Sequence, residues 1–293
     1  MRPMRGEAKG KPRKQMRNPM SAKLDYNATV AARVEITPGL IILRVVPDET
    51  LFDFQPGQYT VLGLKRREPR IPDADPDSPA TIARDEDFMI RRAYSIASSS
   101  LAKEFAEFYI TVVRSGELTP RLFHLQVGDR LYMGRKATGI FTIEQVPPHK
   151  HLLLIATGTG LAPYISMIRT HLVCGGQRLF VVLHGARYSW DLGYRDELMH
   201  LAQLCPNFRY FPSISRPQAD PTWSGLTGRL QEIFRSGVVQ DQVGLAITPA
   251  LFDVFLCGNP AMIEDFTLML EAQGFTKHEG KKQAGTLHVE EYW

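Results

Sequence analysis

The four residues Arg92-Ala93-Tyr94-Ser95 combine side chains that suit a diphosphate attached to a flat ring system. An arginine offers a rigid fork of donors that matches phosphate oxygens, and a tyrosine offers a flat apolar face with a polar tip. In an extended strand, Arg92 and Tyr94 would share one face and Ser95 would lie on the other. Taken alone, the four residues are explained equally well by an ordinary amphipathic strand.

Gly116-Glu117-Leu118-Thr119-Pro120 is typical of the start of a helix. We expect Thr119 to cap this helix and Pro120 to occupy its first turn. The free N–H groups at such a helix start would suit a phosphate. A plain capped helix is nevertheless the better explanation of this segment by itself.

Gly158-Thr159-Gly160-Leu161-Ala162-Pro163 follows an apolar run and opens an expected helix. Glycines let a dinucleotide approach the backbone, and a helix N-terminus favours its pyrophosphate. The segment lacks the Gly-Lys-Ser/Thr ending of an ATP-binding loop and the third glycine of the usual dinucleotide fingerprint. The prediction of a dinucleotide-binding turn therefore depends on the position of this segment between an expected strand and an expected helix.

Three arginines, Arg187, Arg216 and Arg229, lie just past the ends of successive expected strands, with Ala186 and Ser215 beside them. Ligands of open α/β sheets bind outside the carboxyl ends of the strands. An arginine cluster there suits the 2′-phosphate that distinguishes NADP from NAD. The alternative is that the three are scattered surface arginines.

Cys257-Gly258-Asn259-Pro260 and the end of the chain complete the set. A small cysteine side chain at a strand end would border a nicotinamide, although a buried cysteine before a turn is equally consistent with the pattern. Tyr292 and Trp293 need a surface to stack on, which either a bound flavin with its adenine or the core of the protein would provide. Glu290 is a candidate proton relay, but a solvated glutamate is the simpler expectation.

Up to residue 146 the chain reads as short strands separated by turn signals, which predicts a small antiparallel barrel. The expected strands cover residues 31–36, 40–46, 58–64, 93–97, 107–113 and 130–133. Residues 65–90 interrupt this rhythm with prolines and acids, and we expect them to form a long surface insertion.

From residue 151 the pattern changes to apolar strands that alternate with helical segments, which predicts a parallel sheet with helices on both faces. Residues 286–293 look like one more strand. The sequence thus predicts two domains after a disordered basic tail (residues 1–23). A β-barrel would cover residues 24–147, and a doubly wound α/β domain would cover residues 148–293.

The composition excludes several classes of protein. No apolar run is long enough to cross a bilayer, and no secretory signal is visible. The three cysteines include no C-x-x-C pair, so we expect no disulfide framework and a cytoplasmic location. Residues 1–20 carry seven basic residues against one acid, which makes the tail +6 and leaves −2 for the rest, so the overall +4 does not indicate nucleic-acid binding.

Together and in this order, Arg-x-Tyr-Ser, Gly-Thr-Gly-Leu-Ala-Pro, Cys-Gly-Asn-Pro and a terminal Tyr-Trp resemble the bacterial ferredoxin/flavodoxin–NADP⁺ reductases, and most closely the subgroup ending in Tyr-Trp. The resemblance runs from about residue 24 to the end. It implies an FAD-binding barrel, an NADP-binding domain, and hydride exchange between NADP(H) and FAD followed by one-electron exchange with ferredoxin or flavodoxin. Three alternatives stay open: a flavin or nucleotide sensor without turnover, the reductase component of an oxygenase, and a nucleic-acid binder that acts through the tail.

The resemblance also implies roles for individual residues. Those expected to act at the reacting ring are Tyr94, Ser95, Cys257 and Tyr292. Those expected to contact FAD are Arg92, Ala93, Tyr94, Ser95, Tyr109, Ile110, Thr111, Val112, Glu117, Leu118, Thr119, Tyr292 and, at the adenine, Trp293. Those expected to contact NADP(H) are Thr159, Ala186, Arg187, Ser215, Arg216 and Arg229.

The expected partner is an acidic carrier, ferredoxin or flavodoxin, and the protein is expected to be a monomer that uses no metal. A basic rim would steer such a carrier. Its candidate residues are Lys65, Arg66, Arg67, Arg91, Lys281 and Lys282, each of which is also consistent with a solvated surface position.

Overall fold

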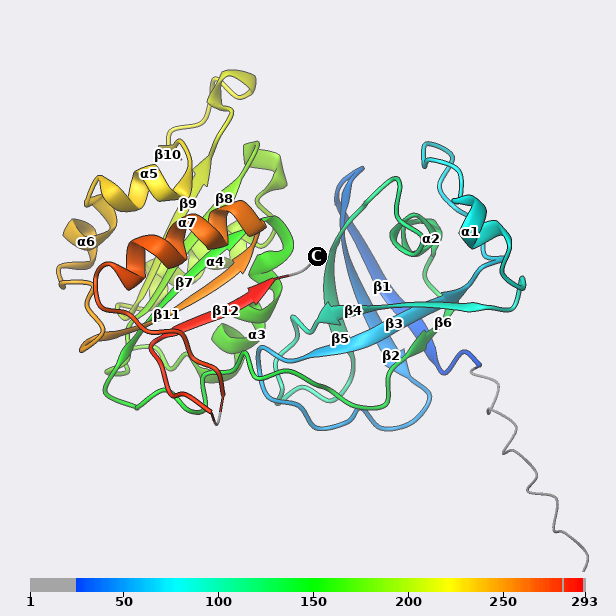
Figure 1. Cartoon of the computed structure of the whole chain (residues 1–293), viewed down its shortest axis with the longest axis horizontal. Coiled ribbons are helices and arrows are strands. Elements are labelled where there is room, and N and C mark those ends of the chain that lie inside the picture. The colour runs from blue at the N-terminus through cyan, green and yellow to red at the C-terminus, as the bar shows by residue number, and fades with distance from the viewer. Residues whose placement is uncertain (1–24, 281, 292–293) are drawn as a thin grey trace, which may run out of the picture.

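The computed structural model describes residues 25–280 and 282–291. The predictions for the basic tail, for Lys281 and for the terminal Tyr292 and Trp293 fall outside these residues. The described chain forms two bodies side by side, one for each predicted half (Figure 1). Each is built around its own six-stranded sheet.

The first body is an antiparallel barrel in which the strands follow the order β4-β3-β6-β1-β2-β5. Beyond the end of β4, the N–H of Ala97 donates to the carbonyl oxygen of Glu107 at 2.7 Å and so joins the two edges. The short helix α2 (Thr119–His124) packs against the barrel core. The strands are β1 (Ala28–Thr37), β2 (Leu40–Pro47), β3 (Tyr59–Lys65), β4 (Met89–Ser95), β5 (Ala106–Thr111) and β6 (Arg130–Met133).

The strand β2 shows how the barrel faces its neighbour. Its residues Leu40 to Leu43 are all buried, although a strand with one wet face would alternate. Ile41 belongs to the barrel core, whereas Leu40 and Ile42 belong to a second apolar cluster shared with the α/β body. The near-continuous apolar run therefore marks a strand that is covered on both faces.

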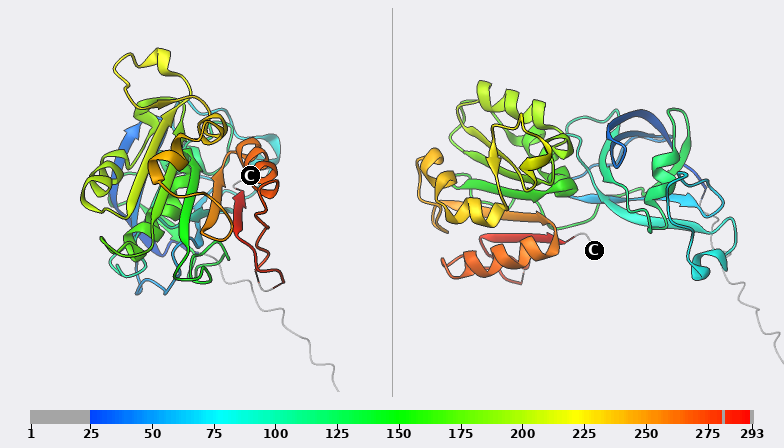
Figure 2. Two further views of the ribbon diagram at one scale, coloured as in Figure 1. Left: turned by 90° about the vertical axis from the view of Figure 1, so that its left-hand side faces the viewer. Right: turned by 90° about the horizontal axis from the view of Figure 1, so that it is seen from above.

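The second body is a parallel sheet with the order β10-β9-β8-β7-β11-β12. Helices α3 and α4 cover one face and α5, α6 and α7 cover the other (Figure 2). The elements are β7 (His151–Thr157), α3 (Ala162–His171), β8 (Phe180–Ala186), α4 (Arg195–Leu204), β9 (Phe208–Ile214), β10 (Leu226–Thr227), α5 (Leu230–Arg235), α6 (Val238–Val243), β11 (Phe252–Gly258), α7 (Pro260–Glu271) and β12 (Leu287–Glu291).

The chain enters this sheet at β7, builds outward through β8, β9 and β10, and returns to add β11 and β12 on the other side. The order reverses between β7 and β11, so their loops diverge and leave a crevice at the carboxyl ends of the strands. The prediction of a barrel followed by a doubly wound sheet is confirmed.

Residues 65–90 are more than the surface loop that we expected. They contain the short helix α1 (Pro79–Ile82), and β4 begins at Met89, four residues before the predicted strand start. Asp77 of this segment accepts a hydrogen bond from Arg121 of α2 at 3.1 Å, and the Arg121 side chain is only 2% exposed. Acids that look like a solvated run in the sequence thus fasten the segment to the barrel.

The expectation that the cysteines form no disulfide is wrong for one pair. Cys174 and Cys205 are joined, with their Cα atoms 4.6 Å apart, and Cys257 is a free, buried thiol. Cys174 follows α3 and Cys205 follows α4, and both loops lie at the edge where the parallel strands begin. Parallel topology brings these positions together although 31 residues separate them.

None of the helices within residues 25–280 and 282–291 combines the length and apolar character needed to cross a membrane.

Candidate functional site: a cleft between the barrel and the parallel sheet

A cavity of about 820 Å³ opens between the two bodies at the carboxyl ends of the parallel strands. The barrel contributes the β1–β2 turn around Gly39 and the residues at the end of β5, Thr111 and Val112. The α/β body contributes the first residues after β7, β8, β9 and β11. The cavity therefore lies at the crevice that the strand order creates.

Two glycines make the floor of this crevice. A Cβ on Gly160 would stand 2.4 Å from the carbonyl oxygen of Cys257, and a Cβ on Gly258 would stand 2.3 Å from Oγ1 of Thr157. Gly258 also has a φ of +132°, which side chains rarely adopt. The same Thr157 hydroxyl accepts a hydrogen bond from the N–H of Asn259 at 2.8 Å. The turn after β7 therefore lies directly against the end of β11, and both glycines line the cavity.

Four of the residues predicted for NADP(H) line one side of the cleft: Ala186, Arg187, Ser215 and Arg229. Thr159 lines its floor. Arg216 does not join them, because its Nη1 donates to the hydroxyl of Tyr188 at 3.1 Å and its guanidinium lies 5.8 Å from the centre of that ring. Two guanidinium groups and a hydroxyl thus gather where a phosphate would complement them.

The Arg92-Ala93-Tyr94-Ser95 motif lies in β4, at one end of the barrel sheet order. Nη2 of Arg92 donates to Oε2 of Glu117 at 2.6 Å, and the other oxygen of that carboxylate, Oε1, accepts hydrogen bonds from Arg84 and Thr81. The Thr81 hydroxyl and the guanidinium of Arg92 hold the pKa of Glu117 below its ordinary value despite partial burial. The structure thus joins two of the predicted phosphate-binding motifs directly.

The predicted cap at Thr119 is wrong. Thr119 lies inside the first turn of α2, and Leu118 occupies the capping position without a side-chain bond. The Thr119 hydroxyl instead accepts from the N–H of Val113 at 2.9 Å and donates to its carbonyl oxygen at 3.1 Å. These two hydrogen bonds of Thr119 stabilise the turn between β5 and α2. The side chain of Leu118 is buried in the barrel core.

The β5 residues predicted to contact FAD separate by face. Thr111 and Val112 line the cleft. The side chain of Ile110 is buried in the barrel core. Tyr109 is buried against the α/β body, where its hydroxyl accepts from the N–H of Gly193 at 3.0 Å, and burial raises its pKa. Alternation along the strand places Tyr109 and Thr111 on one face and Ile110 on the other, and Val112 lies just past the strand end.

Cys257 and Glu290 lie opposite each other on the paired strands β11 and β12. Cys257 is fully buried and is not among the described residues that line the cleft. Oε2 of Glu290 is buried and has no hydrogen-bond partner among the described residues, and burial raises the pKa of Glu290 to about 7. The expectation of a solvated glutamate is therefore wrong, because the carboxylate oxygen Oε2 is buried although the residue as a whole is only half-buried.

Three of the six residues predicted for the basic rim, Lys65, Arg66 and Arg67, pair with acids of the same segment. Lys65 is only 8% exposed and lies 3.5 Å from Asp87. Arg67 also pairs with Asp87, and Arg66 lies 3.7 Å from Glu86. The acids of residues 65–90 thus face the bases that precede them, which the sequence pattern alone does not indicate.

Sequence reasoning missed three residues that line the cleft or contact the Glu117 carboxylate. Arg114, directly after β5, lines the cleft and pairs with Asp73. Arg84 and Thr81 contact Glu117 from the segment 65–90. Arg114 could have been found from its place just beyond a predicted cofactor strand, whereas nothing local marks Arg84 or Thr81.

Comparisons with known proteins agree with this geometry. Residues 154–267 match a family described as the oxidoreductase NAD-binding domain. A flavodoxin/ferredoxin–NADP reductase of Escherichia coli (strain K12) is 31% identical over 241 residues, which cover 82% of this chain and 88% of that protein. Ferredoxin–NADP reductase A of Sorangium cellulosum is 37% identical over 193 residues, which cover 63% of this chain and 67% of that protein.

Among solved structures, a ferredoxin NADP⁺ reductase from Neisseria gonorrhoeae with bound FAD and NADP superimposes with a TM-score of 0.76. It shares 23% identity, and the match covers 93% of this chain and all of that chain. That likeness shows the fold, and the sequence relatives show the family. The subgroup ending in Tyr-Trp stays a prediction. The chain belongs to the bacterial flavodoxin/ferredoxin–NADP reductase family.

Proposed function

We propose that this chain is an FAD-dependent ferredoxin/flavodoxin–NADP⁺ oxidoreductase that exchanges hydride with NADP(H) and single electrons with a small carrier. The observation that carries the proposal is the cleft itself. It brings the end of the flavin-side strand β5 together with the glycine-lined crevice at Gly160 and Gly258 and with Arg187 and Arg229. One cavity thus offers a wall for a flat ring, a floor for a pyrophosphate and cations for a further phosphate.

The residues fit FAD on the barrel side. Arg92 and the 117–119 turn would hold its diphosphate, since a guanidinium fork suits two phosphates. Tyr94 would stack on the ring, and Ser95 would hydrogen-bond its edge. Thr111 and Val112 would contact it from β5, whereas Tyr109 and Ile110 support the strand through their own packing. When bound, FAD supplies the acceptor for a hydride and the means of passing electrons on one at a time.

The α/β side fits NADP(H). Gly160 and Gly258 leave the backbone open to the pyrophosphate, and Thr159 would contact the nicotinamide end. Arg187, Ser215 and Arg229 would bind the 2′-phosphate, with Ala186 beneath it. Arg216 would bind the 2′-phosphate from the rim of the cleft once its hydrogen bond to the Tyr188 hydroxyl is broken. The chain's own contribution is orientation, because donor and acceptor must meet at about 3–3.5 Å for hydride transfer.

Cys257, Glu290 and Tyr292 remain the candidates closest to the nicotinamide. The side chain of Cys257 is buried, so Cys257 would contribute by positioning the backbone of Gly258 beside the nicotinamide. A glutamate whose pKa lies near 7 is suited to hold or release a proton at neutral pH. Tyr292 would cover the open face of the flavin and move aside for the nicotinamide, and Trp293 would contact the adenine of FAD.

The partner is ferredoxin or flavodoxin, and we propose a monomeric protein of the cytoplasm. The proposed domain boundaries are 24–147 for the FAD domain and 148–293 for the NADP domain.

An anaerobic visible spectrum tests the function directly. The purified protein should show flavin bands that bleach with one equivalent of NADPH and scarcely with NADH. Addition of oxidised flavodoxin or ferredoxin should then restore the bands. Bands that stay unbleached with either nucleotide would favour a flavin sensor, and bleaching without reoxidation by either carrier would favour an oxygenase reductase.

A further inference from the structure

A second cavity, of about 520 Å³, lies beside β4 and outside the cleft. Three arginines line it, Arg84, Arg91 and Arg92, together with Glu117 and Phe88. The charged groups in its wall therefore sum to +2. A concave site with an excess of guanidinium groups and an aromatic wall suits a phosphorylated ligand.

Within this cavity one carboxylate bridges two arginines. Oε1 of Glu117 lies 3.0 Å from Nη1 of Arg84, and Oε2 lies 2.6 Å from Nη2 of Arg92. The carboxylate therefore presents one oxygen to each guanidinium. A diphosphate can do the same with its two phosphate groups, and its greater charge strengthens both contacts. The carboxylate of Glu117 thus stands where oxygens of a diphosphate would be bound.

The guanidinium of Arg84 stacks on an aromatic ring, that of Phe88. The guanidinium lies 4.8 Å from the centre of the Phe88 ring, although Phe88 is a large apolar side chain that is 44% exposed. A planar guanidinium stacked on a ring is pre-oriented, so less freedom is lost when it binds a ligand.

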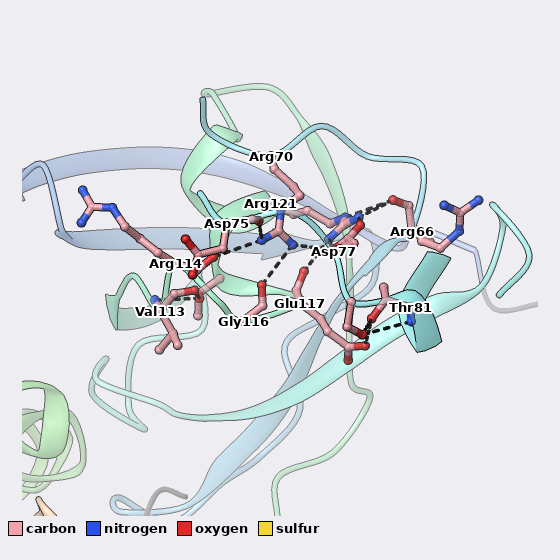
Figure 3. Close-up of polar contacts among 12 residues, drawn as sticks. Arg66, Arg70, Asp75, Asp77, Thr81, Val113, Arg114, Gly116, Glu117 and Arg121 are labelled. Carbon is pink, nitrogen blue, oxygen red and sulfur yellow. Dashed lines mark hydrogen bonds and ion pairs between the residues drawn. The ribbon is translucent and has the colours of Figure 1, made fainter. Parts of the chain in front are cut away.

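The segment that carries Arg84 is fixed to the barrel by a buried ion pair (Figure 3). Nη1 of Arg121 donates to Asp77 at 3.1 Å and to the backbone oxygen of Glu117 at 2.6 Å. Arg70 also pairs with Asp77, and its guanidinium donates to the backbone oxygen of Gly116 at 3.1 Å. Hydrogen bonds therefore join the segment 65–90 to the 116–117 turn, and Arg84 lies beside Glu117.

We propose that this segment completes the FAD site, with Arg84 as a second arginine that binds the diphosphate. Glu117 holds the guanidinium groups of Arg84 and Arg92 together and yields Arg92 to the diphosphate when FAD binds. The inference rests on the proposed function, because it takes FAD as the ligand of β4. Arg92 lies two residues before Tyr94, so it meets the phosphate nearer the flavin, and Arg84, from the outer segment, meets the phosphate nearer the adenosine.

An acidic patch of the carrier is the rival occupant of these arginines. The geometry favours the diphosphate, because the two guanidinium groups converge on one carboxylate that is 20% exposed, although the Arg84 and Arg92 side chains are themselves 36% and 56% exposed. A carrier presents carboxylates that are spread over a convex surface, and such a surface meets exposed charges at a rim.

The test measures flavin affinity of the full-length chain after its flavin is removed, by the quenching of FAD and FMN fluorescence on rebinding. Loss of a charged hydrogen-bond donor costs on the order of 10- to 100-fold in affinity. Arg84→Gln should therefore weaken FAD by that factor and leave FMN unchanged, because FMN lacks the second phosphate. Arg92→Gln should weaken both flavins.

Arg67→Gln is the matched control, since Arg67 lies in the same segment but pairs with Asp87 away from the cavity. It should leave both affinities unchanged. Arg84→Lys should restore part of the lost FAD affinity by returning the charge. Circular dichroism and thermal midpoints equal to those of the unaltered chain would show that the Arg84 variants are folded.

Normal FAD affinity in a folded Arg84→Gln variant would overturn the inference while leaving the reductase function intact. It would also be overturned if that variant bound FAD normally but reduced flavodoxin with a smaller salt dependence, which would assign Arg84 to carrier docking. An unaltered chain that binds neither flavin would overturn the proposed function and this inference with it.

Discussion

The carboxylate of Glu107, on β5 of the barrel, lies 2.6 Å from Nη1 of Arg169, on α3 of the α/β body. Glu107 is 1% exposed, and its carboxylate also accepts from Arg44 at 2.8 Å and from the hydroxyl of Tyr194 at 2.9 Å. Burial would raise the pKa of Glu107, but Arg169, Arg44 and Tyr194 outweigh it and hold the pKa below its ordinary value. This pair links the two walls of the cleft, so it helps to set the distance between them.

Replacement of Glu107 by glutamine should lower the free energy of unfolding by about 2–4 kcal/mol at pH 7, because Arg169 loses its buried ionic partner and keeps only the partly exposed Glu197. Urea unfolding measures the change. Glu197→Gln is the control, since Glu197 is 35% exposed and meets Arg169 from its outer side, so its loss should cost less than about 1 kcal/mol.

The same variant should show a distinctive pH dependence. A carboxylate whose pKa is lowered by folding stabilises the protein above the ordinary value of 4.5, and this stabilisation is lost as the pH falls through the folded-state value. The difference between the unaltered chain and Glu107→Gln should therefore be constant near pH 7 and shrink below about pH 4.5. A difference that is the same at pH 7 and pH 3 would contradict this account of the ion pair.

Glu290 should behave in the opposite sense. Burial raises its pKa from 4.5 to about 7, so the protein loses stability as the pH rises through that interval. Glu290→Gln should accordingly be nearly neutral at pH 4.5 and stabilising by roughly 1–2 kcal/mol at pH 8. Thermal unfolding at both pH values tests this, with the exposed neighbour Glu291→Gln as the control. An equal effect of Glu290→Gln at the two pH values would show that the carboxyl is not buried as described.

Arg229 should determine the preference for NADPH. Arg229→Ala should weaken NADPH binding about 10- to 100-fold and leave NADH binding unchanged, because only NADPH carries the 2′-phosphate. Titration of the flavin spectrum measures both affinities. Arg235→Ala, in the last turn of α5 and outside the cleft, should change neither. If Arg229→Ala lowered the affinities for NADPH and NADH equally, Arg229 would contact a group common to both nucleotides and not the 2′-phosphate.

Gly160→Ala should damage the crevice directly. The added Cβ would stand 2.4 Å from the carbonyl oxygen of Cys257, so β7 and β11 would have to separate, at a cost of about 1–3 kcal/mol in stability. NADPH affinity should fall as well. Gly158→Ala in the same loop has open space around its Cβ and a φ of +53°, so it should cost only about 1 kcal/mol of backbone strain. Matching losses in the two variants would argue against a close approach at Gly160.

The sequence determined those features that depend on local periodicity and backbone geometry. Alternating short strands predicted the barrel, and strands followed by helices predicted the parallel sheet, because side-chain period and burial are properties of one element at a time. Gly158, Gly160 and Gly258 also predicted the crevice, because backbone geometry is a local property. Gly158 and Gly258 have a positive φ, and Gly160 and Gly258 lie too close to other backbone for a side chain. Arg187, Ser215 and Arg229 could be placed because parallel strands end at one edge.

Only the tertiary structure decided which side chains face each other across long separations in the chain. Packing of the barrel against residues 191–194 buried Tyr109, strand pairing placed Glu290 opposite Cys257, and parallel topology brought Cys174 to Cys205. The acids of residues 65–90 look like a solvated run, but Asp77 holds Arg121 in the core and Asp87 neutralises Lys65. A charged residue gains an ionic partner only when folding brings the two side chains within hydrogen-bond distance. That distance depends on how separate elements pack, which no single stretch of sequence determines.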